Sequence, residues 1–426
     1  MQIWRRPTVN YGEAVGITPI YETSRDALAS LAPQHREIRL VCSPVSLSGL
    51  MAAPTIDLVA EICGSNAKRV EPKMRTLILA AGRFGDTTRA AIAEGREPRL
   101  DVFEIAAQLG ADIIDYGDVE RSGPVLAAMG GRASSASAAV AYLGFRRRDR
   151  YDAILTTGED IGLPLSALLK TSRAHCSHTM IAHTLFPRKK AAFFDYLHVQ
   201  DRVDRILVYS TSEERNAVER LRIPAAKLER IYFHADERFF HPDGRAEEPD
   251  LVSAAGQLLR DYDCLIEAVR EMPVRLQIAA GSPWIDHSLR PRASLPSNVT
   301  WGRLNRFELR DLYARSALTV VPILQNDYQT GIATILEMMA MGKCVIATRT
   351  RGQTDTIVDG VTGIYVPPGD PRALRAAIER MLSHPEEAAR IGRAARQFIE
   401  EQAGLGHFVA RICEAVRVGH AARFAS

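Results

Sequence analysis

From residue 74 to about residue 240, short apolar runs alternate with stretches whose apolar residues recur at helical spacing. Strands that alternate with helices predict right-handed crossovers and a parallel sheet. The run opened by Met74 ends in glycine, as a buried parallel strand should. The strands expected here are Leu77–Ala81, Asp112–Asp115, Ala153–Thr156, Thr179–His183 and Arg205–Tyr209. The expected helices are Val102–Leu109, Ala133–Leu143, Leu163–Leu169 and Ser212–Leu221.

A second alternating set follows the polar stretch His241–Asp250, which is typical of an interdomain linker. Its expected strands are Leu251–Ala255, Arg275–Ala280, Val299–Gly302, Leu318–Val321 and a strand around Val345, before a hairpin-like stretch at 356–366. Its expected helices are Tyr262–Arg270, Phe307–Arg315, a helix after Gly331, Leu374–Leu382, Glu386–Glu401 and His407–Val418. We therefore predict an α/β protein with two tandem, doubly wound, Rossmann-like domains and a ligand cleft at the carboxyl ends of their strands.

The first 73 residues lack this alternation, and their strand and helix signals are short and mixed. We expect either an irregular N-terminal extension or a biological start at Met74, which the intact mass of the natively expressed protein would decide. The predicted domains are thus 1–73, the extension; 74–240, the first Rossmann-like domain; 241–405, the second; and 406–426, a C-terminal helix.

Composition limits the classes of function. The formal net charge of +3 is too small to indicate a nucleic-acid partner. Six cysteines lie scattered without a pairing pattern, which favours reduced thiols and a cytoplasmic protein. From the sequence we expect neither a signal peptide nor a membrane-spanning segment, because the N-terminus lacks an apolar core and no apolar run reaches spanning length. Two basic runs, Arg146–Arg148 and Arg188–Lys190, indicate either solvated surface or peripheral contact with an anionic bilayer.

The most informative segment is Asp327–Thr348. Its small residues Thr330 and Gly331 precede a helix, whose free backbone N–H groups and positive dipole end suit a diphosphate. Glu337 is the one acid on this apolar helix, about two turns further along. An unpaired buried carboxylate is costly, so a ribose diol that donates two hydrogen bonds would explain it. The alternative is a partly exposed glutamate that forms a salt bridge with a neighbour.

This segment resembles the nucleotide-sugar signature of retaining GT-B glycosyltransferases of family four, the glycosyl transferases group 1. The resemblance extends over roughly residues 74–426 and implies that the last helix crosses back to the first domain. Glu337 matches the second glutamate of the signature, which in the family holds the donor ribose. Gln329 stands where the first glutamate is usual, and Ile332 takes the place of the usual glycine.

Further donor contacts are expected in the second domain. Arg260 follows a glycine turn near a helix start, where a guanidinium suits a leaving diphosphate; the alternative is a surface pair with Asp261. By resemblance, Gln257 stands near the family's arginine position, and the backbone of Arg303 and Leu304 reads the nucleobase. The resemblance therefore implies this set of donor-binding residues: Gln257, Arg303, Leu304, Thr330, Gly331, Ile332 and Ala333.

His183 ends a strand of the first domain, and strand ends in this fold face the cleft. The resembling enzymes have a histidine here, which implies contact with the transferred sugar; the alternative is a structural histidine bonded to backbone. Glu159, with Asp160, follows another strand and is expected to hold the acceptor or to cap its helix. Gly82 and Arg83 follow the first strand and are expected on the acceptor side as well.

No metal or other cofactor is predicted. His175 and His178 are three residues apart while His183 ends a strand, so their side chains do not converge as zinc ligands do. No Asp-x-Asp lies beside a strand end in the second domain, so side-chain cations and the helix dipole are expected to stabilise the diphosphate instead.

The predicted function is a metal-independent, hexosyltransferase-like enzyme that moves a sugar from a nucleotide diphosphate sugar, with retention, to a sugar, lipid or small-molecule acceptor. Its predicted catalytic residues are His183, Arg260, Gln329 and Glu337. Two alternatives stay open: a nucleotide-sugar-binding protein with weak or lost activity, because Gln257, Gln329 and Ile332 depart from the family pattern, and a GT-B phosphorylase or epimerase.

Overall fold

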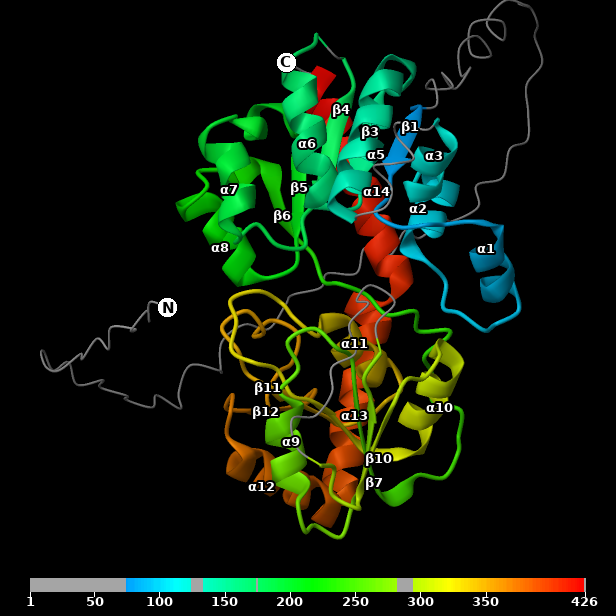
Figure 1. Ribbon diagram of the computed structural model, residues 1–426, viewed down its shortest axis with the longest axis vertical. Helices are drawn as coiled ribbons and strands as arrows, with labels where there is room; N and C mark the ends of the chain where they lie inside the picture. Colours follow the sequence, from blue (N-terminus) through cyan, green and yellow to red (C-terminus); the bar gives the residue numbers. More distant parts are fainter. Residues whose placement is uncertain (1–73, 124–132, 174, 282–293, 425–426) are drawn as a thin grey trace, which may run out of the picture. The chain divides into compact units, whose positions relative to one another are not determined.

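The computed structural model describes residues 74–123, 133–173, 175–281 and 294–424. These residues belong to one compact unit, Val70–Ser426, which holds two six-stranded sheets (Figure 1). Every strand pair in both sheets is parallel. The α/β class and the pair of Rossmann-like domains are therefore confirmed. The prediction for residues 1–73 lies outside the described residues.

The first sheet has the order β2-β1-β3-β4-β5-β6. Its strands are β1 Thr76–Leu79, β2 Asp112–Ile114, β3 Ala153–Thr156, β4 Ser177–Ile181, β5 Arg205–Val208 and β6 Leu228–Arg230. The helices along this half are α1 Asp86–Ala93, α2 Asp101–Leu109, α3 Tyr116–Arg121, α5 Ala133–Arg147, α6 Glu159–Lys170, α7 Arg188–Asp195 and α8 Thr211–Glu219. Sequence analysis did not identify β6, α1, α3 or α7.

Side-chain alternation sends neighbouring residues of β1 into different cores. Ile78 packs with residues of α2 and of the C-terminal helix. Leu77 and Leu79 pack on the other face with residues of α5 and α6. Both faces of the first sheet are thus covered, which explains why β1 reads as an unbroken apolar run.

The second sheet has the order β12-β11-β10-β7-β8-β9. Its strands are β7 Glu248–Ala255, β8 Arg275–Ala279, β9 Val299–Gly302, β10 Ser316–Val321, β11 Val345–Thr348 and β12 Ile364–Val366. The helices of this half are α9 Tyr262–Val269, α10 Arg306–Arg315, α11 Ile332–Ala340, α12 Pro371–Ser383 and α13 Pro385–Phe398. One core contains residues of α9 and α12, and the other contains residues of α10 and α11.

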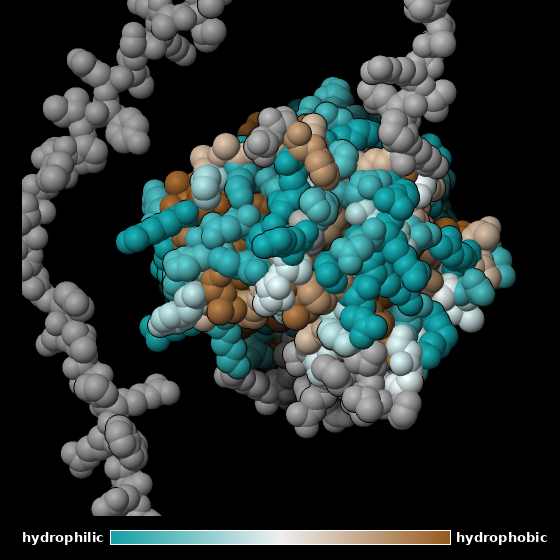
Figure 2. All heavy atoms as spheres, turned by 90° about the horizontal axis from the view of Figure 1, so that it is seen from above, coloured by the Kyte–Doolittle hydropathy of each residue, from teal (hydrophilic) through white to brown (hydrophobic). Residues whose placement is uncertain are grey.

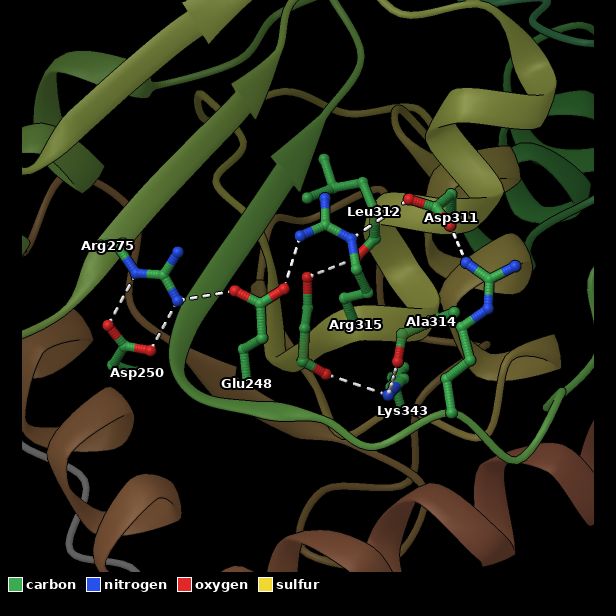
Figure 3. A network of polar contacts seen from close by, with 10 residues as sticks. Glu248, Asp250, Arg275, Asp311, Leu312, Ala314, Arg315 and Lys343 are labelled. Atoms are coloured by element: carbon green, nitrogen blue, oxygen red, sulfur yellow. Dashed lines mark hydrogen bonds and ion pairs between the residues drawn. The ribbon is translucent and has the colours of Figure 1, made fainter.

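Two local predictions in this half were wrong. The linker was expected to reach Asp250, but β7 begins at Glu248, where Arg275 of β8 bonds both Glu248 and Asp250 (Figure 3). Because these ion pairs satisfy polar side chains at the sheet's amino end, the strand extends further than its apolar run. The stretch 356–366 ends in β12, which pairs with β11 in parallel and does not form an antiparallel hairpin.

The C-terminal helix crosses back to the first sheet, as predicted. A π-helical turn at Ile399–Ala403 follows α13 and leads to α14, Leu405–Phe424. Helix α14 runs beside the first sheet (Figure 1). Its residues Phe408, Ile412 and Val416 are buried in the core that contains Ile78 of β1. Residues from the end of the chain therefore complete the core of its first domain.

The distribution of hydrophilic and apolar side chains on the surface is relevant to the predicted contact with a membrane. Seen from above in Figure 2, hydrophilic side chains cover most of the face, and apolar ones lie in small groups between them. Among the described residues, no helix combines the length and the apolar character needed to cross a bilayer.

Candidate active site

Two adjoining cavities lie where the carboxyl ends of the strands meet. The α11 cavity has a volume of about 370 Å³ and contains the start of α11. The α2 cavity has a volume of about 440 Å³ and contains the start of α2. Both are lined by His183, Tyr209, Phe233, Arg306, Ala333 and Glu337. These shared residues make the two cavities parts of one continuous site.

The α11 cavity brings together most of the residues predicted for the donor. The predicted residues in its lining are His183, Gln257, Arg260, Leu304, Gln329, Thr330, Gly331, Ile332, Ala333 and Glu337. They come from segments more than 150 residues apart in the chain, so only the fold assembles them.

The start of α11 leaves backbone donors free. Gly331 is the N-cap residue, with φ +81°, and no side chain caps the helix. A Cβ at Gly331 would lie 3.1 Å from Nη1 of Arg260 and 3.2 Å from a methyl group of Val321, so both backbone angle and space require glycine. The N–H groups of Ile332 and Ala333 are therefore available to an anion at the positive end of the helix dipole.

Arg260 lies buried beneath this helix start. Its guanidinium donates to Ala255 O at 3.0 Å, Leu258 O at 2.8 Å and Thr334 Oγ1 at 3.1 Å. These acceptors are neutral, and burial lowers the pKa of Arg260. Asp261 instead caps α9 by accepting from Cys264 N, so the expected alternative of a surface pair is not observed. A buried guanidinium with only neutral hydrogen-bond acceptors favours an anionic ligand nearby.

Glu337 is 8 % exposed and forms an ion pair with Arg306, whose Nη1 lies 2.9 Å from Oε1. Burial raises the pKa of Glu337, although the charge of Arg306 opposes this effect. The buried carboxylate of Glu337 thus has a charged partner within the protein, Arg306, in addition to the ribose expected from the sequence. Arg306 was not predicted from the sequence, although Asn305 and Glu308 form a capping box that marks it as the first residue of α10.

The two glutamines carry polar atoms without partners. Both amide atoms of Gln257 are buried and make no hydrogen bond with the described residues. Gln329 donates through Nε2 to Thr356 Oγ1 at 3.1 Å, while its Oε1 is buried without a hydrogen-bond partner among the residues that the structure describes. An unsatisfied buried polar group costs about 1–3 kcal/mol, so these three atoms favour a polar ligand in the α11 cavity.

His183 follows β4 and lines both cavities. Its Nε2 lies 3.0 Å from Thr157 O, which can only accept, so Nε2 carries the proton of this bond. The ring is exposed, while its backbone N–H donates to Glu159 Oε2 at 2.8 Å. His183 therefore bonds to backbone, as expected of a structural histidine, and also lines the cavities, as expected of a residue that contacts the sugar.

Gly82, Arg83 and Glu159, which were expected on the acceptor side, are not among the residues that line either cavity. Arg83 pairs with Glu120, while Ala81 and Phe84, which flank the Gly82–Arg83 turn, line the α2 cavity. Glu159 is buried and contacts protein groups, a placement that differs from the expected contact with an acceptor.

Two other expectations have a different outcome in the structure. Asp160 does not cap α6, because Gly158 holds the N-cap position and no side chain caps the helix there. Arg303 is not among the lining residues of the α11 cavity, whereas its neighbour Leu304, predicted with it, is.

A metal cluster is not found among the described residues, since no three His, Cys, Asp or Glu side chains are grouped to hold an ion. His178 lies instead in the core between β3 and α6, bonded to Thr156 and Ser166.

Sequence relatives point to one class of protein. The family model described as glycosyl transferases group 1 matches residues 250–384. An α-D-kanosaminyltransferase from Streptomyces kanamyceticus is 24% identical over 53% of this chain and 63% of its own length. A GDP-mannose-dependent α-mannosyltransferase from Mycolicibacterium smegmatis is 26% identical over 58% of this chain and 64% of its own. The chain thus spans less than two thirds of either relative.

Solved structures are similar in fold at low identity. Sucrose-phosphate synthase from Thermosynechococcus elongatus superposes with a TM-score of 0.63 and 17% identity, covering 82% of this chain and 100% of the other. Anabaena HepE, in complex with UDP and glucose, gives a TM-score of 0.58 and 14% identity, covering 81% of this chain and 99% of the other. The two parallel sheets and the α14 crossover give this chain the GT-B fold of these structures, and its residues 250–384 are similar to the glycosyl transferases group 1.

Proposed function

We propose that this protein is a glycosyltransferase that binds a nucleotide diphosphate sugar in the α11 cavity and transfers its hexose with retention. One observation carries the proposal: free backbone donors of α11, the buried Arg260 and the amide atoms of Gln257, unpartnered among the described residues, line the same cavity as Glu337. The proposal agrees with the family and with the relatives, whose names specify glycosyl transfer.

The diphosphate would lie at the start of α11. The N–H groups of Ile332 and Ala333 and the guanidinium of Arg260 would stabilise the charge that develops as the diphosphate leaves. Because these groups supply positive potential, we propose that the transfer needs no metal ion. Glu337, oriented by Arg306, would accept hydrogen bonds from the ribose hydroxyls.

The transferred sugar would lie between the two halves of the site. Gln329 Oε1 and His183 are the expected contacts with its hydroxyl groups. We propose no protein nucleophile: the transition state resembles an oxocarbenium ion, and the departing phosphate takes the acceptor proton. The acceptor, a sugar, a lipid or a small molecule, would enter through the α2 cavity, beside Phe84 and His183.

The second candidate is a nucleotide-sugar-binding protein without turnover. It is favoured by Gln257 and Gln329, which are neutral where the resembling enzymes carry charge. Donor binding combined with hydrolysis and transfer no faster than in buffer would favour this candidate. Phosphate-dependent sugar release without an acceptor would instead favour a phosphorylase.

A thermal-shift screen of nucleotides and nucleotide sugars identifies the donor, because a ligand at 100 times its Kd stabilises the folded state by about 2.7 kcal/mol. Since relatives are named for GDP-mannose and structural neighbours were solved with UDP or UDP-glucose, uridine and guanosine compounds come first.

Glu337→Ala should then weaken binding of that donor by about 10- to 100-fold, because a charge-assisted hydrogen bond to the ribose is lost. Isothermal titration measures the change. Glu337→Gln, which keeps one acceptor oxygen beside Arg306, should weaken binding less. Glu379→Ala on α12, whose glutamate pairs with the exposed Arg375 outside the cavity, is the control and should bind as the wild type does. Unchanged donor affinity in Glu337→Ala would contradict the ribose assignment.

Peripheral contact with a membrane stays a prediction. The basic runs on α5 and at the start of α7 would make the contact if the acceptor is a lipid. Co-sedimentation with vesicles that contain anionic lipid should exceed co-sedimentation with neutral vesicles, and equal amounts would contradict the prediction.

A further inference from the structure

The turn after β4, His183–Leu185, is held from below by two buried carboxylates. His183 and Thr184 of this turn line the α11 cavity. The backbone N–H of His183 donates to Glu159 Oε2 at 2.8 Å, and that of Leu185 donates to Glu213 Oε2 at 3.2 Å. The two glutamates come from the first turns of α6 and α8. Two helices thus fix one short turn at the edge of the site.

Burial and an ion pair hold the Glu159 carboxylate in place. Glu159 is 2 % exposed, and Lys190 of α7 forms an ion pair with its Oε1. Burial alone would raise the pKa of Glu159, but the neighbouring charges of His183 and Lys190 outweigh burial and lower it. The carboxylate therefore stays ionised and accepts a charge-assisted hydrogen bond from the turn, which is stronger than a neutral one.

The buried position of Glu213 is unfavourable for the stability of the fold, because a carboxylate is taken out of water there. Glu213 is 1 % exposed, and its Oε1 is buried without a hydrogen-bond partner among the described residues. The charged groups that face it are Glu159 from α6 and Lys190 from α7. Burial raises the pKa of Glu213 to about 7. A glutamine would avoid the penalty of burying a charge, so a carboxylate here is typical of a functional site.

We propose that Glu159 and Glu213 are positioning residues that hold the His183–Leu185 turn, and with it His183 and Thr184, against the transferred sugar. The role rests on the proposed glycosyl transfer. Neither carboxylate lines the α11 cavity, so each acts through the turn. A displacement of 1 Å at a reacting centre can lower a rate by about 100-fold, so a small movement of the turn is sufficient to affect turnover.

The test compares charge-neutral variants with a matched neighbour. Glu159→Gln and Glu213→Gln should each lower kcat by about 10-fold, and Glu159→Ala by about 100-fold. Binding of the nucleoside diphosphate alone should change by less than about twofold, because the diphosphate contacts come from the second domain. Glu214→Gln, which removes the neighbour that pairs with Arg230, should retain wild-type kcat.

A pH profile separates positioning from general stability. Wild-type kcat should rise from about pH 6 to about pH 8, as ionisation of Glu213 strengthens its hydrogen bond with the Leu185 N–H. Glu213→Gln should lack this step, and hydrogen–deuterium exchange of residues 183–186 should be faster in it than in Glu214→Gln. Melting temperatures show that each variant is folded.

The experiments distinguish a failure of the proposed glycosyltransferase function from a failure of the positioning role. If the wild type neither transfers nor hydrolyses any sugar donor, the glycosyltransferase function fails and the positioning role with it. If the wild type is active, and folded Glu159→Ala and Glu213→Gln keep its kcat and pH profile, the positioning role alone is overturned. Loss of diphosphate binding together with kcat would also overturn it, because the damage would then extend beyond the turn.

Discussion

At the scale of single residues, Gln257 and Gln329 define the candidate site most directly. Three of their amide atoms are buried in the α11 cavity without hydrogen-bond partners among the described residues. In the sequence these glutamines stood out as departures from the family pattern. In the structure the same atoms are acceptors and a donor that a sugar or a nucleotide can satisfy. A departure in charge therefore does not remove the capacity to bind.

His178 makes stability depend on pH. The ring is fully buried between Thr156 and Ser166, and burial lowers the pKa of His178 to about 3. In the unfolded chain its pKa is about 6.5, so the unfolded state takes up a proton first as the pH falls. The stabilising effect is complete above pH 6.5 and is lost progressively toward pH 3.

We expect urea unfolding to show about 2 kcal/mol less stability at pH 5 than at pH 7 from this residue alone. In His178→Gln the pH dependence over this interval should be weaker by that amount, whatever the variant's stability at pH 7. His407→Gln, which replaces an exposed histidine, should retain the wild-type slope. Identical slopes in the wild type and His178→Gln would contradict the assignment.

At the scale of elements, α13 packs at very close range against the turn that ends α11. An ideal Cβ at Gly392 of α13 would lie 2.0 Å from the carbonyl oxygen of Gly342. Backbone cannot move away as a flexible side chain can, so Gly392→Ala should destabilise the protein by about 2–3 kcal/mol. Denaturant unfolding measures the loss.

Gly406 of α14 provides the control for this prediction. A Cβ there meets no atom within 4 Å, and alanine favours helix, so Gly406→Ala should be neutral or more stable by up to about 1 kcal/mol. Equal stability of Gly392→Ala and Gly406→Ala would contradict the prediction that the close contact between α13 and Gly342 requires glycine at position 392.

The elements with a strong apolar period were predictable, and the short polar ones were not. Thr76–Leu79 is an apolar run with a glycine turn behind it, and the structure has a buried strand there. Leu228–Arg230 has three residues, too few to display alternation. Helix α7 begins with Arg188–Lys190, which the sequence presents as a solvated basic run. Lys190 instead pairs with Glu159, a partner 31 positions away that no local pattern indicates.

At the scale of the whole molecule, α14 makes the stability of the first domain depend on the end of the chain. Ile412 is fully buried in the core that contains Ile78 and Leu155. Ile412→Ala should therefore lower the free energy of unfolding by about 2–4 kcal/mol. Hydrogen–deuterium exchange should accelerate in β1, β3 and β4 more than in β7 and β10.

Val418→Ala is the matched control, because Val418 lies on the same helix with 40 % of its surface exposed. It should leave exchange in both sheets unchanged. Faster exchange confined to the second sheet in Ile412→Ala would contradict the crossover packing.

The sequence alone determined the class of fold and predicted residues that line the α11 cavity, because apolar periodicity and a helix opening on small residues are local properties of the chain. Tertiary structure decided the partners. Arg306 pairs with Glu337, and Glu159 and Glu213 bond to the turn that carries His183. These contacts join residues 24 to 31 positions apart, and their energies depend on burial and distance, which arise only when the sheets and helices pack.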